Sequence, residues 1–432
     1  MSVLEGRSRE EAKPSMLAQL RASPLAVVDV GTTKIACFIA RPRPSRGFNL
    51  LGRGYQLAEG FERGEVVDAA AAANSLAAVL HEAEAQAGET LREVVLVTTA
   101  GRPRSRVVEV EEELQGAPLH DERLGRLLRA AARAACGEEE EVLHVVPVEV
   151  RVDGGRPLRN PRGIRGERVA LAAAVVTARA APLRALLQCL ERCHLHAVEV
   201  VAAGYAAAIG AATEEEMERG CLVLDFGGGT TTLAHFADGR LACLDAVPYG
   251  GEHVTGDIVY GLSTSRSFAE RLKTLQGSVI ARGADEDARI TVPQLGDASG
   301  APSAEIPRAQ LVRIVRARVE EILEFVQERI RAQGELFDRR PPRSIVLTGG
   351  GSTLDGLEEL VEEMFGIPAR RGRPGLVQSR DGIEDEPCCA AASGALALAV
   401  GDDDGLSWSE LQEAGGLSGW LGRFARWFER NF

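Results

Sequence analysis

The sequence predicts a layered α/β fold made of two related halves, with a further unit inserted in the first half. Short apolar runs rich in β-branched residues alternate with long Ala-rich helical segments, and this alternation is typical of α/β layers. A strand, a Gly/Thr turn and a second strand begin near residue 25 and recur near residue 221. A unit that recurs at this separation indicates duplication.

The first half begins with a predicted β-hairpin. Residues 25–30 and 35–40 are apolar runs on either side of the turn Gly31-Thr32-Thr33-Lys34, and such a pairing around a Gly/Thr turn favours a hairpin. A helix over 66–87 and a strand over 94–98 are predicted next. Helices over 182–193 and 202–212 complete this half.

An inserted subdomain is predicted between about residues 99 and 177. Here the pattern changes to short β-type runs at 107–110, 145–152 and 169–176, with one Arg-rich helical segment at 121–135. Helical patterns resume only after this region. We therefore expect it to pack as a unit of its own.

The second half repeats the strand, glycine turn and strand pattern. Residues 221–226 and 231–236 are apolar runs around Gly227-Gly228-Gly229-Thr230. A third strand is predicted at 343–348, and Gly349-Gly350-Gly351-Ser352 follows it. Long helices are predicted over 308–333 and 389–400, with a surface loop around the acidic stretch 285–303.

The glycine turns are candidate phosphate-binding sites. A glycine without a Cβ lets backbone N–H groups approach phosphate oxygens. One such turn is weak evidence, because hairpins use glycine for conformational reasons alone. Asp29 and Asp225, near the ends of the first strands of the two hairpins, are hard oxygen ligands suited to Mg²⁺ through its waters. Thr32 and Thr33 add hydroxyl donors, and Lys34 adds a cation for the phosphates.

The composition excludes several classes of function. A net charge of −13 argues against broad binding to nucleic acid, which needs clustered Lys and Arg. The eight cysteines are scattered without CxxC pairs, so we expect reduced thiols. Residues 1–22 carry no apolar signal segment and are predicted to be a disordered tail. No apolar run is long enough to cross a bilayer as a helix.

The C-terminus is a second, independent signal. Aromatic residues make up 4% of the chain, yet the last sixteen residues hold five of them. On a helix over 417–432 the apolar residues share an arc of roughly 140° and the arginines lie opposite, which predicts an amphipathic helix lying on an anionic membrane surface. The candidate membrane-binding residues are Trp420, Leu421, Arg423, Phe424, Arg426, Trp427, Phe428 and Arg430. The alternative is a helix that docks on its own domain or in a groove of a partner protein.

An acidic linker is predicted to precede this helix. Residues 401–416 contain three aspartates, two glutamates and no basic residue. Like charges repel one another and extend a chain. We expect the linker to free the terminal helix from the core.

The three glycine turns, at 31–34, 227–230 and 349–352, resemble those of the actin, heat-shock chaperone and sugar kinase superfamily. Within this superfamily the chain resembles the bacterial cell-division FtsA family. The sequence Asn-Pro-Arg-Gly-Ile-Arg-Gly at 160–166 carries the narrower likeness, because it lies in a subdomain specific to that family. Further matching stretches are 203–206, 248–251, 255–258 and 269–273.

The resemblance implies an actin-like (ribonuclease H-like, duplicated) ATPase fold. The implied parts are subdomain 1A at 23–98 and 177–217, inserted subdomain 1C at 99–176, subdomain 2A at 218–262 and 334–400, and subdomain 2B at 263–333. The implied cofactors are ATP and Mg²⁺. The implied nucleotide-binding residues are Gly31, Thr32, Thr33, Lys34, Gly227, Gly228, Gly229, Thr230, Glu270, Lys273, Gly349, Gly350, Gly351 and Ser352.

The roles implied for Glu270 and Lys273 have an alternative. Glu270 and Lys273 would border the ribose and adenine, although Glu and Lys three apart on a helix are often only a solvated pair. Glu199 is the candidate for orienting a hydrolytic water. We expect ATP turnover to be slow or absent.

The resemblance also implies a cellular role. It predicts a peripheral protein on the cytoplasmic face of the cell membrane at the division site. There it would self-associate, bind the C-terminal tail of the tubulin-like protein FtsZ, anchor the Z ring and recruit later division proteins. The alternatives are an actin-like pilus-assembly ATPase of the PilM type and a small-molecule kinase of the same superfamily.

Overall fold

The structure is a computed structural model that describes residues 24–43, 47–293, 303–378, 382–401 and 405–412. The predicted N-terminal tail at 1–22 and the predicted membrane helix at 417–432 lie outside the described residues. Within them the strands form sheets of six, five and four strands and two short two-stranded sheets.

The first sheet has the strand order β10-β6-β1-β2-β3-β18. β1 and β2 form the predicted antiparallel hairpin, and β6 and β10 continue the sheet in parallel. Its strands are β1 Leu25–Val30, β2 Lys34–Pro42, β3 Phe48–Leu57, β6 Glu93–Thr98, β10 His196–Ala202 and β18 Val377–Gln378. The short pair β4 Phe61–Glu62 and β5 Glu65–Val66 lies between β3 and β6 in the chain.

The second sheet, β13-β12-β11-β16-β17, repeats this topology. In both sheets a three-stranded antiparallel meander is joined by a parallel strand beside its first strand. The prediction of two related halves is therefore confirmed. The strands are β11 Cys221–Phe226, β12 Thr231–Ala237, β13 Arg240–Val247, β16 Ser344–Thr348 and β17 Ala369–Arg371.

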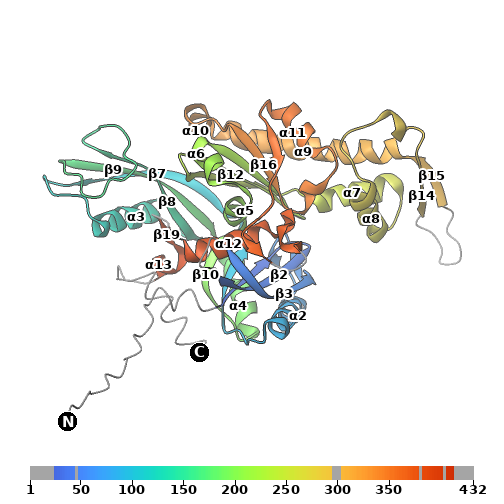
Figure 1. Ribbon diagram of the computed structural model, residues 1–432, viewed down its shortest axis with the longest axis horizontal. Helices are drawn as coiled ribbons and strands as arrows, with labels where there is room; N and C mark the ends of the chain where they lie inside the picture. Colours follow the sequence, from blue (N-terminus) through green and yellow to red (C-terminus); the bar gives the residue numbers. More distant parts are fainter. Residues whose placement is uncertain (1–23, 44–46, 294–302, 379–381, 402–404, 413–432) are drawn as a thin grey trace, which may run out of the picture.

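Two Ala-rich helices, α5 Ala203–Ala211 and α12 Ala390–Val400, pack against each other between the two sheets (Figure 1). They approach so closely that a Cβ on Gly394 would lie 1.8 Å from the backbone oxygen of Ala206. Small residues therefore set this interface. The other face of the first sheet is covered by α2 Ala69–Ala87 and α4 Ala180–Arg192.

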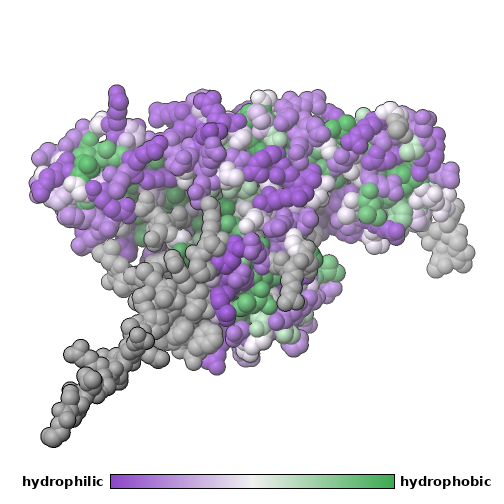
Figure 2. Space-filling view, viewed as in Figure 1, coloured by the Kyte–Doolittle hydropathy of each residue, from purple (hydrophilic) through white to green (hydrophobic). Residues whose placement is uncertain are grey.

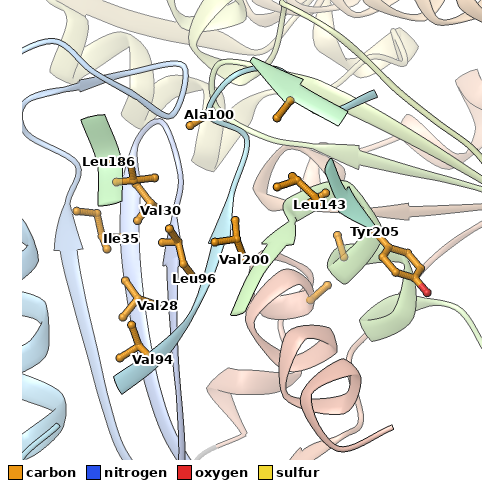
Figure 3. Close-up of a cluster of buried hydrophobic side chains, with 14 of the residues drawn as sticks. Val28, Val30, Ile35, Val94, Leu96, Ala100, Leu143, Leu186, Val200 and Tyr205 are labelled. Carbon is orange, nitrogen blue, oxygen red and sulfur yellow. The ribbon is translucent and has the colours of Figure 1, made fainter. Parts of the chain in front are cut away.

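The main core lies on that covered face. Figure 3 shows Val28, Leu96 and Val200 side by side on β1, β6 and β10, with Leu186 of α4 against the sheet. All four are fully buried. Burial of apolar surface contributes about 25 cal/mol of stability per Å² removed from water. Packing of these side chains therefore stabilises the sheet and fixes the positions of its strand ends.

Two further units project to opposite ends of the long axis (Figure 1). The inserted unit consists of β7 Arg104–Glu113, α3 Asp121–Ala135, β8 Glu140–Val152 and β9 Arg168–Arg179. The outer arm consists of α7 Gly251–Leu262, α8 Arg266–Gln276, β14 Arg289–Pro293, β15 Ser303–Pro307 and α9 Arg308–Ala332. Three further helices are α6 Glu214–Arg219, α10 Gly334–Arg339 and α11 Leu357–Phe365.

The acidic stretch expected to be a loop differs in part from the prediction. Residues Arg289–Pro293 and Ser303–Pro307 pair as an antiparallel hairpin. Ile290 and Val292 alternate with polar residues and are buried, so a period-two pattern was present inside the low-complexity region.

The predicted acidic linker also differs from the structure. Within 401–416, β19 Leu406–Ser407 pairs with β8, and α13 Trp408–Gln412 follows it. The Trp408 Nε1–H donates to Glu141 at 3.3 Å. Leu406, Trp408 and Leu411 pack on the buried clusters. Apolar contacts thus outweigh charge repulsion in this segment, while 402–404 and 413–416 lie outside the described residues.

The surface in Figure 2 is mostly hydrophilic, with small separate hydrophobic patches over the described residues. Among the helices of the described residues, none combines the length and the apolar character that a bilayer crossing requires.

Candidate nucleotide-binding site

The first two glycine turns, one from each sheet, lie against each other. Each turn closes in the same way: the Gly31 N–H donates to the Lys34 oxygen at 3.1 Å, and the Gly227 N–H donates to the Thr230 oxygen at 3.0 Å. A Cβ on Gly228 would lie 2.6 Å from the Thr33 Cγ2. The turns are therefore in contact, and glycine is required for this approach.

The same closeness holds for the next residue. A Cβ on Gly229 would lie 2.7 Å from the Thr32 Oγ1. The structure thus brings together the six predicted residues Thr32, Thr33, Lys34, Gly227, Gly228 and Gly229, although they come from two halves of the chain.

Asp29 and Asp225 occupy equivalent places, one residue before the end of β1 and of β11. Burial raises the pKa of Asp29 to about 6, against the opposing charge of Lys34. Burial, together with the charge of Asp29, raises the pKa of Asp225 to about 7. The two carboxyl groups therefore lie close enough to repel each other when both are ionised.

This pair fits a divalent cation. A bound Mg²⁺ would offset the repulsion between the carboxylates, and hard oxygen ligands are those that Mg²⁺ prefers. In the described part of the chain no three His, Cys, Asp or Glu side chains are grouped as a metal site. Asp29 and Asp225 would therefore share the ion with water and phosphate oxygens.

Lys34 opens β2 beside this pair. Its Nζ donates to the Cys388 Sγ at 3.4 Å and lies 4.9 Å from the centre of the Tyr55 ring. Burial alone would lower the pKa of Lys34, but the neighbouring Cys388, Cys389 and Asp29 raise it overall. Sequence reasoning missed Cys388 and Tyr55, because nothing local links them to the first turn.

The third glycine turn reaches the same place. Gly349 follows β16 with a φ of 80°, and a Cβ there would lie 2.2 Å from the Asp225 Oδ1. The Ser352 hydroxyl donates to the Gly349 oxygen at 2.7 Å, and Ser352 is fully buried. Its hydroxyl holds the turn, while Gly350 is exposed and available to pack against a base.

Glu270 and Lys273 are linked to the second turn through the start of α7. The Gly251 N–H donates to the Gly227 oxygen at 2.9 Å. The Lys273 Nζ donates to the Gly251 oxygen at 3.1 Å and to Glu270 at 2.7 Å. The Lys273 side chain is only 14% exposed, so this is not a freely solvated surface pair.

Glu199 lies on β10, two strands away from β1. Its carboxylate accepts hydrogen bonds from the Ser409 hydroxyl at 2.7 Å and the Ser409 N–H at 3.3 Å. The structure therefore gives Glu199 a role in holding α13, which sequence reasoning did not foresee. Its role in orienting water stays a prediction.

A cavity of about 350 Å³ adjoins the second turn. Thr230 and Thr232 line it together with Gly204 of α5 and Arg329 of α9. Asp29, Lys34 and Gly349 do not line it, so it is a chamber beside the turns rather than the space between the aspartates.

Comparisons with known proteins agree with this architecture. The family model described as "Cell division protein FtsA" matches residues 222–394, and the model "SHS2 domain inserted in FTSA" matches 100–177. The chain is 33% identical over 429 residues to the cell division protein FtsA of Agrobacterium fabrum, covering 96% of each chain. It is 26% identical over 418 residues to that of Escherichia coli, covering 94% of this chain and 97% of the other.

Solved structures show the same fold. The PilM-PilN type IV pilus biogenesis complex superposes with a TM-score of 0.62 at 20% identity, over 87% of this chain and 98% of that one. MreB5 of Spiroplasma citri bound to ADP gives 0.52 at 14% identity, over 88% and 96%. The predicted actin-like fold is confirmed by these neighbours. With full-length relatives above 30% identity and both family models matched, the chain belongs to the FtsA family of cell-division proteins.

Proposed function

We propose that this protein binds Mg-ATP between its two halves, self-associates in an actin-like manner and anchors the Z ring to the cytoplasmic face of the cell membrane. The Z ring is the polymer of the tubulin-like protein FtsZ, whose C-terminal tail is the proposed partner. Family membership supports the division role. Recruitment of later division proteins is part of the same proposal.

The observation that carries nucleotide binding is the contact between the two glycine turns. The contact brings the N–H groups and hydroxyls of the two turns near the cation of Lys34 and the carboxylates of Asp29 and Asp225. Such a group of residues has donors for phosphate oxygens and acceptors for a magnesium ion. Two MreB5 structures with this fold are described as bound to ADP and to AMPPNP.

Weak or absent hydrolysis is part of the proposal. Phosphoryl transfer to water needs a residue that positions the nucleophile. The carboxylate of Glu199, the sequence-based candidate, is already hydrogen-bonded to Ser409. We therefore propose that ATP acts mainly by holding the two halves together.

Membrane binding is assigned to residues 417–432. Four residues separate this segment from Gln412, the last residue of α13. A chain of this length spans at most roughly 18 Å. The helix would therefore keep the body, and in particular the junction of β8 and β10 with α13, close to the headgroups.

Liposome co-sedimentation tests the anchoring. The intact protein should pellet with anionic vesicles, while a variant lacking 417–432 should stay in the supernatant. Trp420→Ala with Trp427→Ala should lose binding even to neutral vesicles, and Arg423→Gln with Arg426→Gln should lose mainly the anionic preference. Equal pelleting of all four proteins would contradict the proposal.

The link to the division polymer has its own test. A synthetic peptide with the C-terminal tail sequence of FtsZ from the same cell should bind the vesicle-bound protein and a scrambled peptide should not. Binding that is equal for the two peptides would refute the proposed partner, whatever the outcome with vesicles.

A further inference from the structure

Cys388 lies in the wall of the candidate nucleotide site. Its Sγ accepts a hydrogen bond from the Lys34 Nζ at 3.4 Å, and a Cβ on Gly350 would lie 3.9 Å from the Cys388 Cβ. It therefore lies next to both Lys34, the proposed phosphate-binding cation, and Gly350, the glycine available to pack against a base. The residue before it, Pro387, accepts hydrogen bonds from Thr348 and Gly349, which fixes the thiol against the third turn.

The surroundings of Cys388 favour the thiolate. The cation of Lys34 stabilises negative charge on the sulfur, and the neighbouring Cys389 Sγ lies 3.9 Å away. The hydrogen bond with Cys389, followed by the charge of Lys34, holds the pKa of Cys388 below its ordinary value against the effect of burial. Burial raises the pKa of the six cysteines outside this pair.

Access separates Cys388 from its neighbour. Cys388 is partly exposed, whereas Cys389 is 2% exposed and shares a contact of 3.6 Å with the Tyr55 hydroxyl. Of the two cysteines, Cys388 is therefore the more accessible to a reagent. Reactive cysteines combine thiolate character with access, and Cys388 has both.

We propose that Cys388 is a modification site inside the nucleotide cleft, where its thiolate reacts with a low-molecular-weight disulfide and the attached group blocks nucleotide binding. This inference rests on the proposed function for the identity of the ligand it blocks. In the step, the Cys388 sulfur attacks one sulfur of the disulfide. A new S–S bond forms, the old S–S bond breaks, and one thiolate leaves with the electron pair.

The mixed disulfide is expected to persist. Adjacent residues have Cα atoms about 3.8 Å apart across a trans peptide, below the roughly 4.4–6.8 Å range of ordinary disulfides. Cys389 is therefore poorly placed to displace the attached group. The adduct would occupy the space beside Lys34 until an added thiol removes it.

The test uses the full-length protein and glutathione disulfide. Peptide mass spectrometry follows adduct formation at Cys388 and at Cys136, a partly exposed thiol in the inserted unit that serves as the internal reference. Cys388 should react at least about tenfold faster than Cys136. Saturating Mg-ATP should slow the reaction at Cys388 by about tenfold or more without changing that at Cys136.

Calorimetry then compares ATP affinity before and after treatment. The wild type and Cys136→Ser should each lose at least about tenfold in affinity and regain it with dithiothreitol. Cys388→Ser, measured against its own untreated sample, should show no change. Slower reaction at Cys388 than at Cys136, or full modification without loss of ATP affinity, would overturn the inference. If the untreated protein binds no ATP at all, the proposed function fails, whereas the ratio of the two reaction rates still decides whether Cys388 is the reactive thiol.

Discussion

Replacing Asp225 with asparagine should make the ligand-free protein more stable while weakening Mg-ATP binding. Asparagine keeps the shape of the side chain and one acceptor oxygen but removes the charge. Asp225 bears this charge in a partly buried place, and the loss of solvation together with the charge of Asp29 raises its pKa from 3.8 to about 7. Each pKa unit corresponds to about 1.4 kcal/mol. Ionisation of Asp225 therefore lowers the free energy of unfolding by at most about 4 kcal/mol above pH 7.

The stability gained by the substitution should be smaller than this limit, because part of the pKa shift comes from repulsion between Asp225 and Asp29. We expect Asp225→Asn to raise the free energy of unfolding by about 1–3 kcal/mol at pH 8. The pH dependence of this gain follows from the raised pKa of Asp225 in the folded state. The cost of the charge is present above the native value of about 7, declines as the pH falls and is absent below the unfolded value near 4, so the gain should disappear at pH 4.

Urea unfolding at pH 8 and at pH 4, followed by circular dichroism, measures this difference. Asp338→Asn, an exposed aspartate on α10, is the control and should change the free energy of unfolding by no more than about 0.5 kcal/mol at either pH. With Mg-ATP present the order should reverse, because the wild type is stabilised by a ligand that the variant binds poorly. An Asp225→Asn protein that is less stable than the wild type at pH 8 without ligand would refute the reasoning.

Three further predictions concern contacts at the glycine turns, at Lys273 and at α13. Gly228→Ala places a Cβ 2.6 Å from Thr33 and should lower ATP affinity by about tenfold in calorimetry, whereas Gly256→Ala, whose Cβ would meet nothing within 4 Å, should stabilise α7 by up to about 1 kcal/mol. Equal ATP affinity in the two variants would contradict the contact between the turns. Lys273→Met removes the ammonium that donates to the Gly251 oxygen, the Thr255 hydroxyl and Glu270. The Thr255 hydroxyl still donates to the other two, but the loss of three charge-assisted bonds should reduce the free energy of unfolding by about 1–3 kcal/mol. Arg271→Met, on the exposed side of the same helix, should have little effect, and a matching loss there would show that helix propensity alone was measured. Glu199→Gln weakens the bonds to Ser409, so in a Trp420→Phe, Trp427→Phe background the Trp408 emission should shift to longer wavelength and the amides of α13 should exchange faster. Unchanged emission and exchange would mean that Glu199 does not hold α13.

The sequence was most informative where the chemistry is local. Each aspartate stands in a strand, a few residues before glycines that close a hairpin, and this order is legible in one stretch of chain. The register then forces equivalence: Asp29 lies opposite Ala36 and beside Val97, as Asp225 lies opposite Thr232 and beside Thr348. Both turns therefore come to corresponding edges of two similar sheets.

Contacts between distant segments were not predictable in the same way. Cys388 meets Lys34 across more than three hundred residues, and no pattern in either segment points to the other. The docked segment shows a different limit. Its acidic residues suggested an extended linker, whereas Trp408 and Leu411 find apolar surface on the first sheet and the inserted unit. Average charge does not reveal whether two apolar side chains have a place to pack.

The central claim is that one magnesium-bound triphosphate is held between Asp29 and Asp225 where the two glycine turns meet. Isothermal titration calorimetry of the wild-type protein with ATP at pH 8, with magnesium and then with EDTA, tests it most directly. We predict one site per chain and an affinity at least about tenfold weaker without magnesium. No heat of binding, or an affinity that is the same with and without magnesium, would contradict the account.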